Sequence, residues 1–224
     1  MRLPGALVLD FDGLILDTET CTYEAVVDIF RAHDMELDLD WWQSILGTAN
    51  HPHWTELLEE RLGRPVDREA LTVQREEARL AALVTLPPCA GVTDLLDAAR
   101  AAGVPCAVAS SSSAGWVVPH LERLGLRDRF AAVITADDVG HDAERSKPAP
   151  DLFLAAARAL GQRPGHCVAL EDSPNGVRAA KAAGMAVVAV PGPMTAGLDF
   201  AAADLVVPSL GGLDVALLGA LVTG

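Results

Sequence analysis

Two aspartates near the start of the chain are the first candidates for chemistry. They follow a short apolar run in the segment Leu7-Val-Leu-Asp10-Phe-Asp12-Gly13. If the extended spacing of two persists, the carboxylates of Asp10 and Asp12 point to the same side. Such a pair repels unless a cation neutralises it, and Mg²⁺ is a hard cation that binds carboxylate and carbonyl oxygens. Taken alone, the segment also fits a turn with two solvated carboxylates.

A second acidic pair, Glu171 and Asp172, follows another apolar run and precedes Ser173 and Pro174. Serine is a common helix N-cap and proline suits the first helical position, so a helix is predicted to begin there. If the two runs form neighbouring strands, four carboxylates converge. A cluster of that charge requires a bound cation, which strengthens the prediction of a metal site.

Residues that could bind phosphate follow two further predicted elements. Ser110 opens a run of four serines after a predicted strand, and Lys147 stands just before a predicted helix. A hydroxyl, loop amides and an ammonium group are the donors that phosphate oxygens need. Each feature alone is more typical of a flexible loop or a solvated lysine. Together with the two acidic pairs, they supply the nucleophile, metal ligands, hydroxyl donor and cation of a phosphoryl-transfer site.

The elements that must position these residues alternate along most of the chain. Short apolar or β-branched runs predict strands at Ala6–Leu9, Val104–Ala109, Ala131–Thr135, Cys167–Leu170, Ala186–Val190 and Leu205–Val207. Apolar residues at helical spacing predict helices at Val92–Ala102, Trp116–Leu124, Pro150–Leu160 and Pro174–Ala183. This alternation predicts βαβ units, and therefore an α/β fold with a Rossmann-like open parallel sheet.

One long stretch interrupts the alternation. Residues 16–87 contain no comparable strand and predict helices at Asp17–His33, Trp41–Leu46, His53–Gly63 and Asp67–Val84. Gly13–Leu16 and Pro87–Gly91 are candidate hinges. We expect a discontinuous core of residues 1–15 and 88–224 and an inserted helical cap domain of residues 16–87. Because ligands bind beyond the carboxyl ends of parallel strands, this insert would stand over the site as a lid.

Composition excludes several classes of function. The 224 residues are 50% hydrophobic and 21% charged, which is typical of a folded protein. The formal net charge of −14 disfavours binding to nucleic acid or to an anionic membrane surface. No uncharged run reads as a membrane-spanning helix or a signal peptide, and we expect a cytoplasmic protein. Nothing reads as a coiled coil, so a monomer is the default expectation.

The four cysteines, Cys21, Cys89, Cys106 and Cys167, are widely spaced and form no CxxC pair. We interpret them as buried thiols rather than as disulfides or zinc ligands, which fits a reducing compartment.

Taken together, the motifs resemble a known family. The segment from Asp10 to Glu19, the strand end at Ser110, the segment Lys147–Asp151 and the segment Glu171–Gly176 are similar to the four motifs of the haloacid dehalogenase superfamily, in the same order. The similarity is closest to the branch with a helical cap after the first motif. That branch includes small-molecule phosphatases and the beta-phosphoglucomutases.

The resemblance implies a role for each aspartate of the first motif. Asp10 would be the nucleophile and would form an aspartyl phosphate. Asp12 would be a general acid and then a general base, and its backbone carbonyl would bind Mg²⁺. This assignment agrees with the chemistry, because a carboxylate nucleophile divides hydrolysis into two displacements and a second carboxyl must protonate the leaving alkoxide.

The other three motifs would hold the metal and the phosphoryl group. By the same resemblance, Asp172 would be a further metal ligand, with Glu171 beside it in direct contact with the metal or one shell away. Ser110, the backbone amide of Ser111 and Lys147 would bind the phosphoryl oxygens. Mg²⁺ and Lys147 would stabilise charge on the transferring group.

The function predicted on these grounds is a Mg²⁺-dependent phosphatase for a small phosphorylated metabolite of the sugar-phosphate kind. Dehalogenation is disfavoured, because the dehalogenases of the superfamily lack the second aspartate. A phosphosugar mutase is the first alternative, although Thr22 stands where the beta-phosphoglucomutases have a histidine and Asn50 where they have an arginine. A receiver-like signalling module is the second, and the length of the chain and the helical insert disfavour it.

Overall fold

The computed structural model describes residues 3–45, 52–140 and 143–222. At its centre lies a parallel sheet with the strand order β3-β2-β1-β4-β5-β6. The strands are β1 (Ala6–Leu9), β2 (Cys106–Ala109), β3 (Ala132–Ile134), β4 (Cys167–Glu171), β5 (Ala186–Ala189) and β6 (Leu205–Val206). The predicted α/β fold and its six strands are therefore confirmed, with ends that differ by one or two residues.

The register of the central strands brings the predicted site residues to one edge of the sheet. Leu9 of β1 pairs with Val108 of β2 on one side and with Leu170 of β4 on the other. The backbone amide of Asp10 donates to the carbonyl of Leu170 at 3.0 Å. The residues that follow β1, β2 and β4 consequently leave the sheet at almost the same level.

Helices cover both faces of this sheet. They are α5 (Val92–Ala101), α6 (Ala114–Arg123), α7 (Asp151–Ala159), α8 (Pro174–Ala182) and α9 (Val215–Gly219). Short 3₁₀ turns lie at Arg127–Arg129, Ala136–Val139, Ala143–Arg145 and Pro164–His166. Helix α9 was not predicted, because its five residues are too few to show a helical period.

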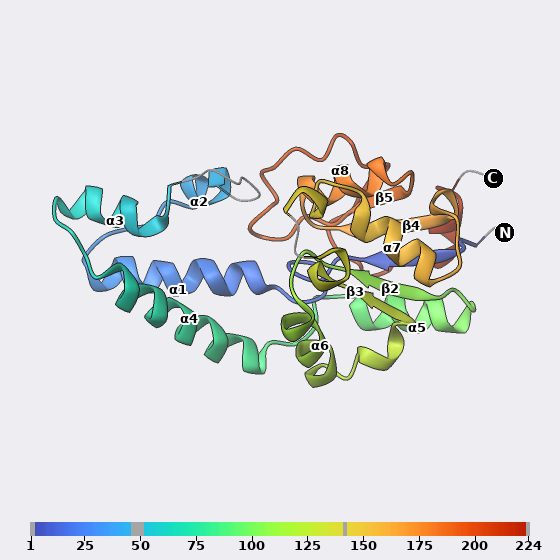
Figure 1. Cartoon of the computed structure of the whole chain (residues 1–224), viewed down its shortest axis with the longest axis horizontal. Helices are drawn as coiled ribbons and strands as arrows, with labels where there is room; N and C mark the ends of the chain where they lie inside the picture. Colours follow the sequence, from blue (N-terminus) through green and yellow to red (C-terminus); the bar gives the residue numbers. More distant parts are fainter. Residues whose placement is uncertain (1–2, 46–51, 141–142, 223–224) are drawn as a thin grey trace.

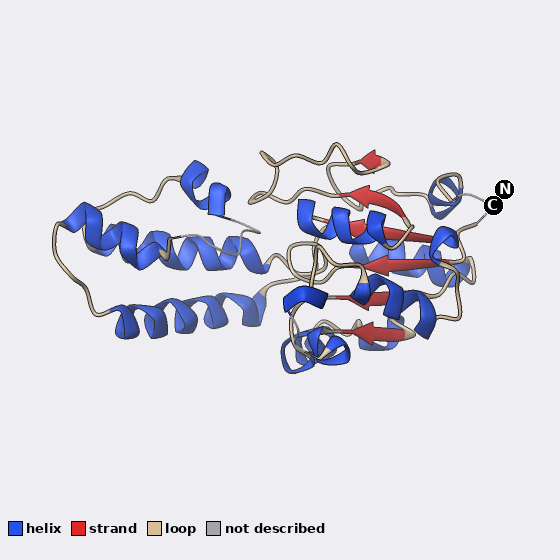
Figure 2. Cartoon of the chain, turned by 45° about the horizontal axis from the view of Figure 1, so that its top comes forward, coloured by secondary structure: helices blue, strands red, loops and turns tan. Residues whose placement is uncertain are grey.

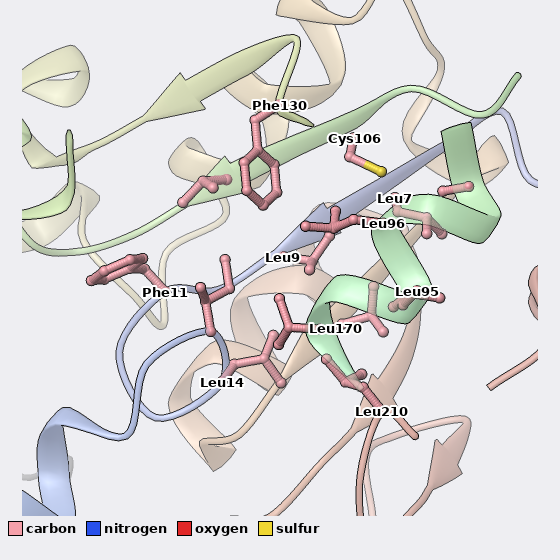
Figure 3. Packing of buried hydrophobic residues seen from close by; sticks show 14 of the residues in the cluster. Leu7, Leu9, Phe11, Leu14, Leu95, Leu96, Cys106, Phe130, Leu170 and Leu210 are labelled. Carbon is pink, nitrogen blue, oxygen red and sulfur yellow. The ribbon is translucent and has the colours of Figure 1, made fainter. Parts of the chain in front are cut away.

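Alternation along β1 divides the core into two clusters. Leu7 and Leu9 face the cluster that contains Leu95 and Leu96 of α5 (Figure 3). Ala6 and Val8, on the opposite face, pack in the cluster that α7 and α8 contribute to. Burial on both faces explains why β1 is a continuous apolar run, and its first polar residue, Asp10, follows where the strand ends.

The insert consists of α1 (Thr18–Ala32), α2 (Leu39–Ile45), α3 (Trp54–Leu62) and α4 (Arg68–Thr85). Asp17 and Asp67 cap α1 and α4 by accepting from the backbone amides of Thr20 and Ala70 at 3.1 Å and 3.0 Å. The helices share their own apolar cluster, which includes Phe30, Trp42, Trp54 and Leu58.

The insert lies beyond the carboxyl ends of the strands. The strand arrowheads point toward the insert, and both chain termini lie at the opposite end of the molecule (Figures 1 and 2). Helices α1 and α4 pack against each other. This placement suits the predicted lid, while the division of the chain into domains at residues 15 and 87 stays a prediction. Two positions used in the sequence analysis fall outside the described residues. They are Leu46, the predicted end of a helix, and Asn50, which stands where the beta-phosphoglucomutases have an arginine.

The structure also bears on the cysteines and on membrane-spanning helices. All four cysteines are free, and three of them are buried. Within the described ranges, no helix has both the length and the apolar character that crossing a membrane requires.

Candidate active site

A cleft of about 570 Å³ opens at the carboxyl ends of the strands. The residues that line it come from every predicted motif and from the helical insert. Among others, the motifs contribute Asp10, Asp12, Ser110, Ser111, Lys147 and Asp172, the insert contributes Thr18, Glu19, Thr22 and Arg79, and Trp116 and Thr195 come from elsewhere in the core. The structure therefore brings together six of the seven predicted site residues at one cleft, and the seventh, Glu171, lies beneath them.

Lys147 lies between two buried carboxylates. Its Nζ donates to Oδ1 of Asp10 and, at 2.6 Å, to Oε1 of Glu171. The side chains of Lys147 and Asp10 are 8% and 9% exposed, and that of Glu171 is fully buried. Burial by itself lowers the pKa of Lys147, but the charges of Asp10 and Glu171 outweigh it and hold the pKa above its usual range. The ammonium group is thus a fixed positive charge beside Asp10.

Glu171 is held from both sides of its carboxylate. One oxygen accepts from Lys147, and the other accepts from the backbone amide and hydroxyl of Ser173 at 3.2 Å and 3.0 Å. A Cβ at Gly176, in the first turn of α8, would clash with this carboxylate. The absence of a side chain at Gly176 lets Glu171 lie under the helix, so that it can fix the position of Lys147.

Asp10, Glu171 and Asp172 form an acidic cluster. One carboxylate oxygen from each lies within 4.8 Å of the others, and all three residues are buried. Gly13 accommodates this packing, because it adopts a φ of +85° and a Cβ there would clash with the carboxylate of Asp172. Local backbone geometry as well as strand order therefore brings the two acidic motifs together.

Negative charge in this acidic cluster exceeds the positive charge beside it. Burial, and next the charge of Glu171, raise the pKa of Asp10 to about 7, although Lys147 acts in the opposite direction. Burial, followed by the charges of Asp10 and Glu171, raises the pKa of Asp172 well above its usual range. Three carboxylates face one ammonium group, and oxygen donors suit a hard cation. The residues present are therefore consistent with a divalent metal ion.

The carboxylate of Asp12 has a different set of partners. Its Oδ1 accepts from the hydroxyl of Thr18 at 3.0 Å and from Nε1 of Trp116 at 2.9 Å. Its Oδ2 accepts from the hydroxyl of Ser112 at 2.6 Å and, more weakly, from that of Ser110 at 3.5 Å. Asp10 and Asp12 both line the cleft, but Asp10 contacts the lysine and Asp12 contacts the serine loop.

The serine run forms a compact turn directly after β2. The backbone amide of Ser110 still donates to the carbonyl of Ile134 on β3 at 3.0 Å, so this residue continues the sheet. Its hydroxyl accepts from the backbone amide of Ser112 at 3.0 Å. Ser110 is buried and Ser111 is exposed, and both line the cleft near Asp12. The turn can therefore present both a hydroxyl and a backbone amide to an anion.

Several residues at the cleft were missed by sequence reasoning. Thr18 and Ser112 lay inside segments that had been singled out, so the motifs themselves could have indicated them. Trp116 and Arg79 offered no comparable signal. Arg79 is one of many charged residues on α4, and Trp116 was predicted only as the start of a helix. In the structure, the guanidinium of Arg79 lies 4.3 Å from the centre of the Trp116 ring.

Known proteins resemble this chain over most of its length. A family model described as haloacid dehalogenase-like hydrolase matches residues 4–184. YhcW of Bacillus subtilis, named as a candidate phosphatase, is 43% identical over 213 residues, which cover 95% of each chain. The fructose-1-phosphate phosphatase YqaB of Escherichia coli is 33% identical over 188 residues, covering 83% of this chain and 96% of YqaB.

A solved structure extends the similarity to the whole fold. The crystal structure of a HAD family hydrolase from Deinococcus radiodurans, with bound phosphate and sodium, superposes with a TM-score of 0.80 and is 28% identical. The match covers 100% of this chain and 99% of that one, so it includes the helical insert.

Proposed function

The chain belongs to the haloacid dehalogenase-like hydrolases, and from this premise we propose that it is a Mg²⁺-dependent phosphatase. Its substrate would be a small phosphorylated metabolite of the sugar-phosphate class, hydrolysed through an aspartyl phosphate on Asp10. The observation that carries the proposal is the position of Asp10, which lines the cleft and pairs with the buried Lys147. The name of the relative YqaB supports the sugar-phosphate class.

The first chemical step is an attack by Asp10 on phosphorus. Lys147 contacts Oδ1 of this carboxylate, and the other oxygen would form the new bond to phosphorus. The bond from phosphorus to the ester oxygen breaks, and Asp12 gives a proton to the departing alkoxide. In the second step Asp12 takes a proton from water, which attacks phosphorus, releases inorganic phosphate and restores Asp10.

The phosphoryl oxygens would be held by donors from residues that line the cleft. These are the hydroxyl of Ser110, the backbone amide of Ser111 and the ammonium group of Lys147. Fixed donors stabilise charge in the transition state more than mobile water does, because they need little reorganisation. Glu171 contributes indirectly, since it keeps the ammonium group beside Asp10.

The metal would be held by Asp10, Asp172 and the backbone carbonyl of Asp12, with Glu171 adjacent. When bound, Mg²⁺ would neutralise the acidic cluster and stabilise negative charge on the transferring group. Because both oxygens of Glu171 already accept hydrogen bonds from Lys147 and Ser173, we assign this residue chiefly to positioning.

The helical insert, residues 16–87, would act as a cap that excludes water during the first step. Its helices α1 and α4 already contribute Thr22 and Arg79 to the lining of the cleft. A phosphosugar mutase remains the alternative within the same chemistry. In that case the phosphoenzyme would return its phosphoryl group to a sugar hydroxyl, and the product would be an isomer instead of free phosphate.

The proposal is tested by phosphate release across a panel of phosphorylated metabolites, including hexose, pentose and glycerol phosphates. We expect release from at least one sugar phosphate in the presence of Mg²⁺, and loss of that release after chelation with EDTA. Product analysis on the same samples separates the two alternatives. Undiminished release in EDTA would contradict the metal requirement, and an isomerised ester without free phosphate would favour the mutase.

Mg²⁺ binding should also be visible without any substrate. At a concentration about 100 times its Kd, a ligand that binds only the folded state adds about 2.7 kcal/mol, which raises Tm by about 5–10 °C for a chain of this size. Asp172→Asn removes a ligand and should reduce this rise. Folding raises the pKa of Asp172, so its ionisation near neutral pH opposes folding. Because asparagine does not ionise, the Tm measured without metal should not fall in this variant.

The matched control for this measurement is Asp67→Asn. Asp67 caps α4 far from the acidic cluster, and asparagine caps helices as well as aspartate does. Thermal unfolding with and without Mg²⁺ should therefore show the full rise in this variant. An equal rise in Asp172→Asn and in the wild type would place the metal elsewhere.

A further inference from the structure

Trp116 is positioned to act on the orientation of Asp12. Its indole Nε1 donates to Oδ1 of Asp12 at 2.9 Å, across 104 residues of sequence. An indole N–H can only donate a hydrogen bond, so this contact holds the oxygen in one direction. A second donor, the hydroxyl of Thr18, reaches the same oxygen from the first turn of α1.

The indole ring is in turn fixed on two sides. His120, one turn further along α6, packs edge-on against it with the ring centres 4.4 Å apart. Arg79 of the insert covers it from outside, with the guanidinium 4.3 Å from the ring centre. That distance is well within the range of a cation–π contact.

Arg79 itself is held by its own helix. Its Nε and Nη2 donate to the two carboxylate oxygens of Glu76 at 3.1 Å and 2.6 Å. The Arg79 side chain is only 15% exposed. Glu76, Arg79, Trp116 and Asp12 therefore form a continuous series of contacts from helix α4 of the insert to the loop that follows β1.

We propose that Trp116 is a positioning residue for Asp12, and that Arg79 connects the insert to that function. The inference rests on the proposed function, because it requires Asp12 to be the general acid. When α4 lies against the core, Arg79 holds the indole in place, and the indole holds the Asp12 carboxyl where it can reach the leaving oxygen. Proton donation to the leaving group thereby depends on the position of the insert.

A purely structural role for Trp116 makes a different prediction. If the ring only fills space between α4 and α6, its replacement should affect all substrates alike. If it positions the general acid, the effect should depend on the leaving group. An alkoxide needs a proton to depart, whereas 4-nitrophenolate does not. The ratio of kcat/KM for an alkyl phosphate to kcat/KM for 4-nitrophenyl phosphate isolates this effect, because kcat/KM reports only steps up to release of the first product.

The experiment compares this ratio in the wild type and in three variants. Trp116→Phe keeps an aromatic ring for Arg79 and His120 but lacks the N–H, and its ratio should fall about tenfold. Arg79→Met should also lower the ratio, by about threefold. The indole keeps its hydrogen bond to Asp12 but loses the cation–π contact with Arg79. Asp12→Asn serves as the reference and should lower the ratio by about 100-fold or more.

The matched control is Arg75→Met. Arg75 lies on the same helix and pairs with the same Glu76 at 3.3 Å, so it tests the loss of a cation from α4 in general, and its ratio should stay at the wild-type value. An unchanged ratio in Trp116→Phe, beside a lowered ratio in Asp12→Asn, would overturn the positioning role and leave the proposed function intact. An unchanged ratio in Asp12→Asn would overturn both. If Trp116→Phe does not fold, the Arg79→Met and Arg75→Met pair decides the question.

Discussion

Replacing Asp10 with asparagine is expected to reduce phosphate release by about 10⁴-fold or more, because a neutral amide cannot attack phosphorus. The replacement has nearly the same shape, and Lys147 keeps Glu171 as a partner. The variant should therefore fold and bind substrate. The measurement is the rate of phosphate release at saturating substrate, together with Tm.

Asp17→Asn is the control for this loss. It makes the same chemical change seven residues along the chain, at the N-cap of α1, where asparagine also caps well. We expect its turnover to remain close to that of the wild type. If the turnover of Asp10→Asn stays within about tenfold of the wild type, another group makes the attack, because removal of the nucleophile lowers the rate by much more than this.

Lys147→Met is expected to impair both catalysis and stability. The ammonium group is the counter-charge for two buried carboxylates, and removal of one partner from a buried ion pair costs about 3–5 kcal/mol, or a fall in Tm of about 10 °C. Turnover should fall by about 10³-fold, because a fixed charge on the phosphoryl group is lost. Thermal unfolding and phosphate release measure the two effects separately.

The pH dependence of this destabilisation has a definite sign. Lys147 acts to lower the pKa of Asp10, which burial and Glu171 raise to about 7. With the lysine present, the pKa of Asp10 is already about 7, and without it this carboxyl holds its proton to a still higher pH in the folded state. The additional stability that the variant loses is therefore lost as pH rises above about 7. The loss of Tm should therefore be smaller at about pH 5.5 than at about pH 8. Saturating Mg²⁺ should restore part of it.

Lys181→Met provides the matched control. Lys181 pairs with Asp204 at 2.8 Å, but its side chain is 38% exposed. Exposed pairs contribute about 0–1 kcal/mol, so this variant should keep nearly the wild-type Tm at both pH values. An equal loss of stability in the two lysine variants would contradict the interpretation of Lys147 as a buried counter-charge.

The sheet and the convergence of the motifs were predictable from the sequence because both follow from local rules. Apolar runs such as Ala6–Leu9 end in polar residues at the same edge, and parallel strands bring these ends together. The helical insert was predictable for a similar reason. After Leu16 the strand-like apolar runs stop, and apolar residues recur at the spacing of a helix. The same apolar spacing places residues such as Trp42 and Trp54 in the apolar cluster that the helices of the insert share.

The arrangement of partners within the site could not be predicted in the same way. Spacing placed four carboxylates at one edge, but it could not show that Lys147 pairs with Asp10 and Glu171 while Asp12 faces the serine turn. That outcome depends on side-chain packing, including the close approach that Gly176 permits. Residues on helix surfaces, such as Trp116 on α6 and Arg79 on α4, reach the site only through the way these helices pack in three dimensions, which no local pattern reports.

The central claim is that a carboxylate of the chain attacks phosphorus before water does. The most direct test is the configuration at phosphorus after hydrolysis of an ester made chiral with isotopically labelled oxygen and sulfur. Two successive in-line displacements each invert the phosphorus centre, so the product should retain its original configuration. Inversion would mean a single displacement by water, and Asp10 would then not be the nucleophile.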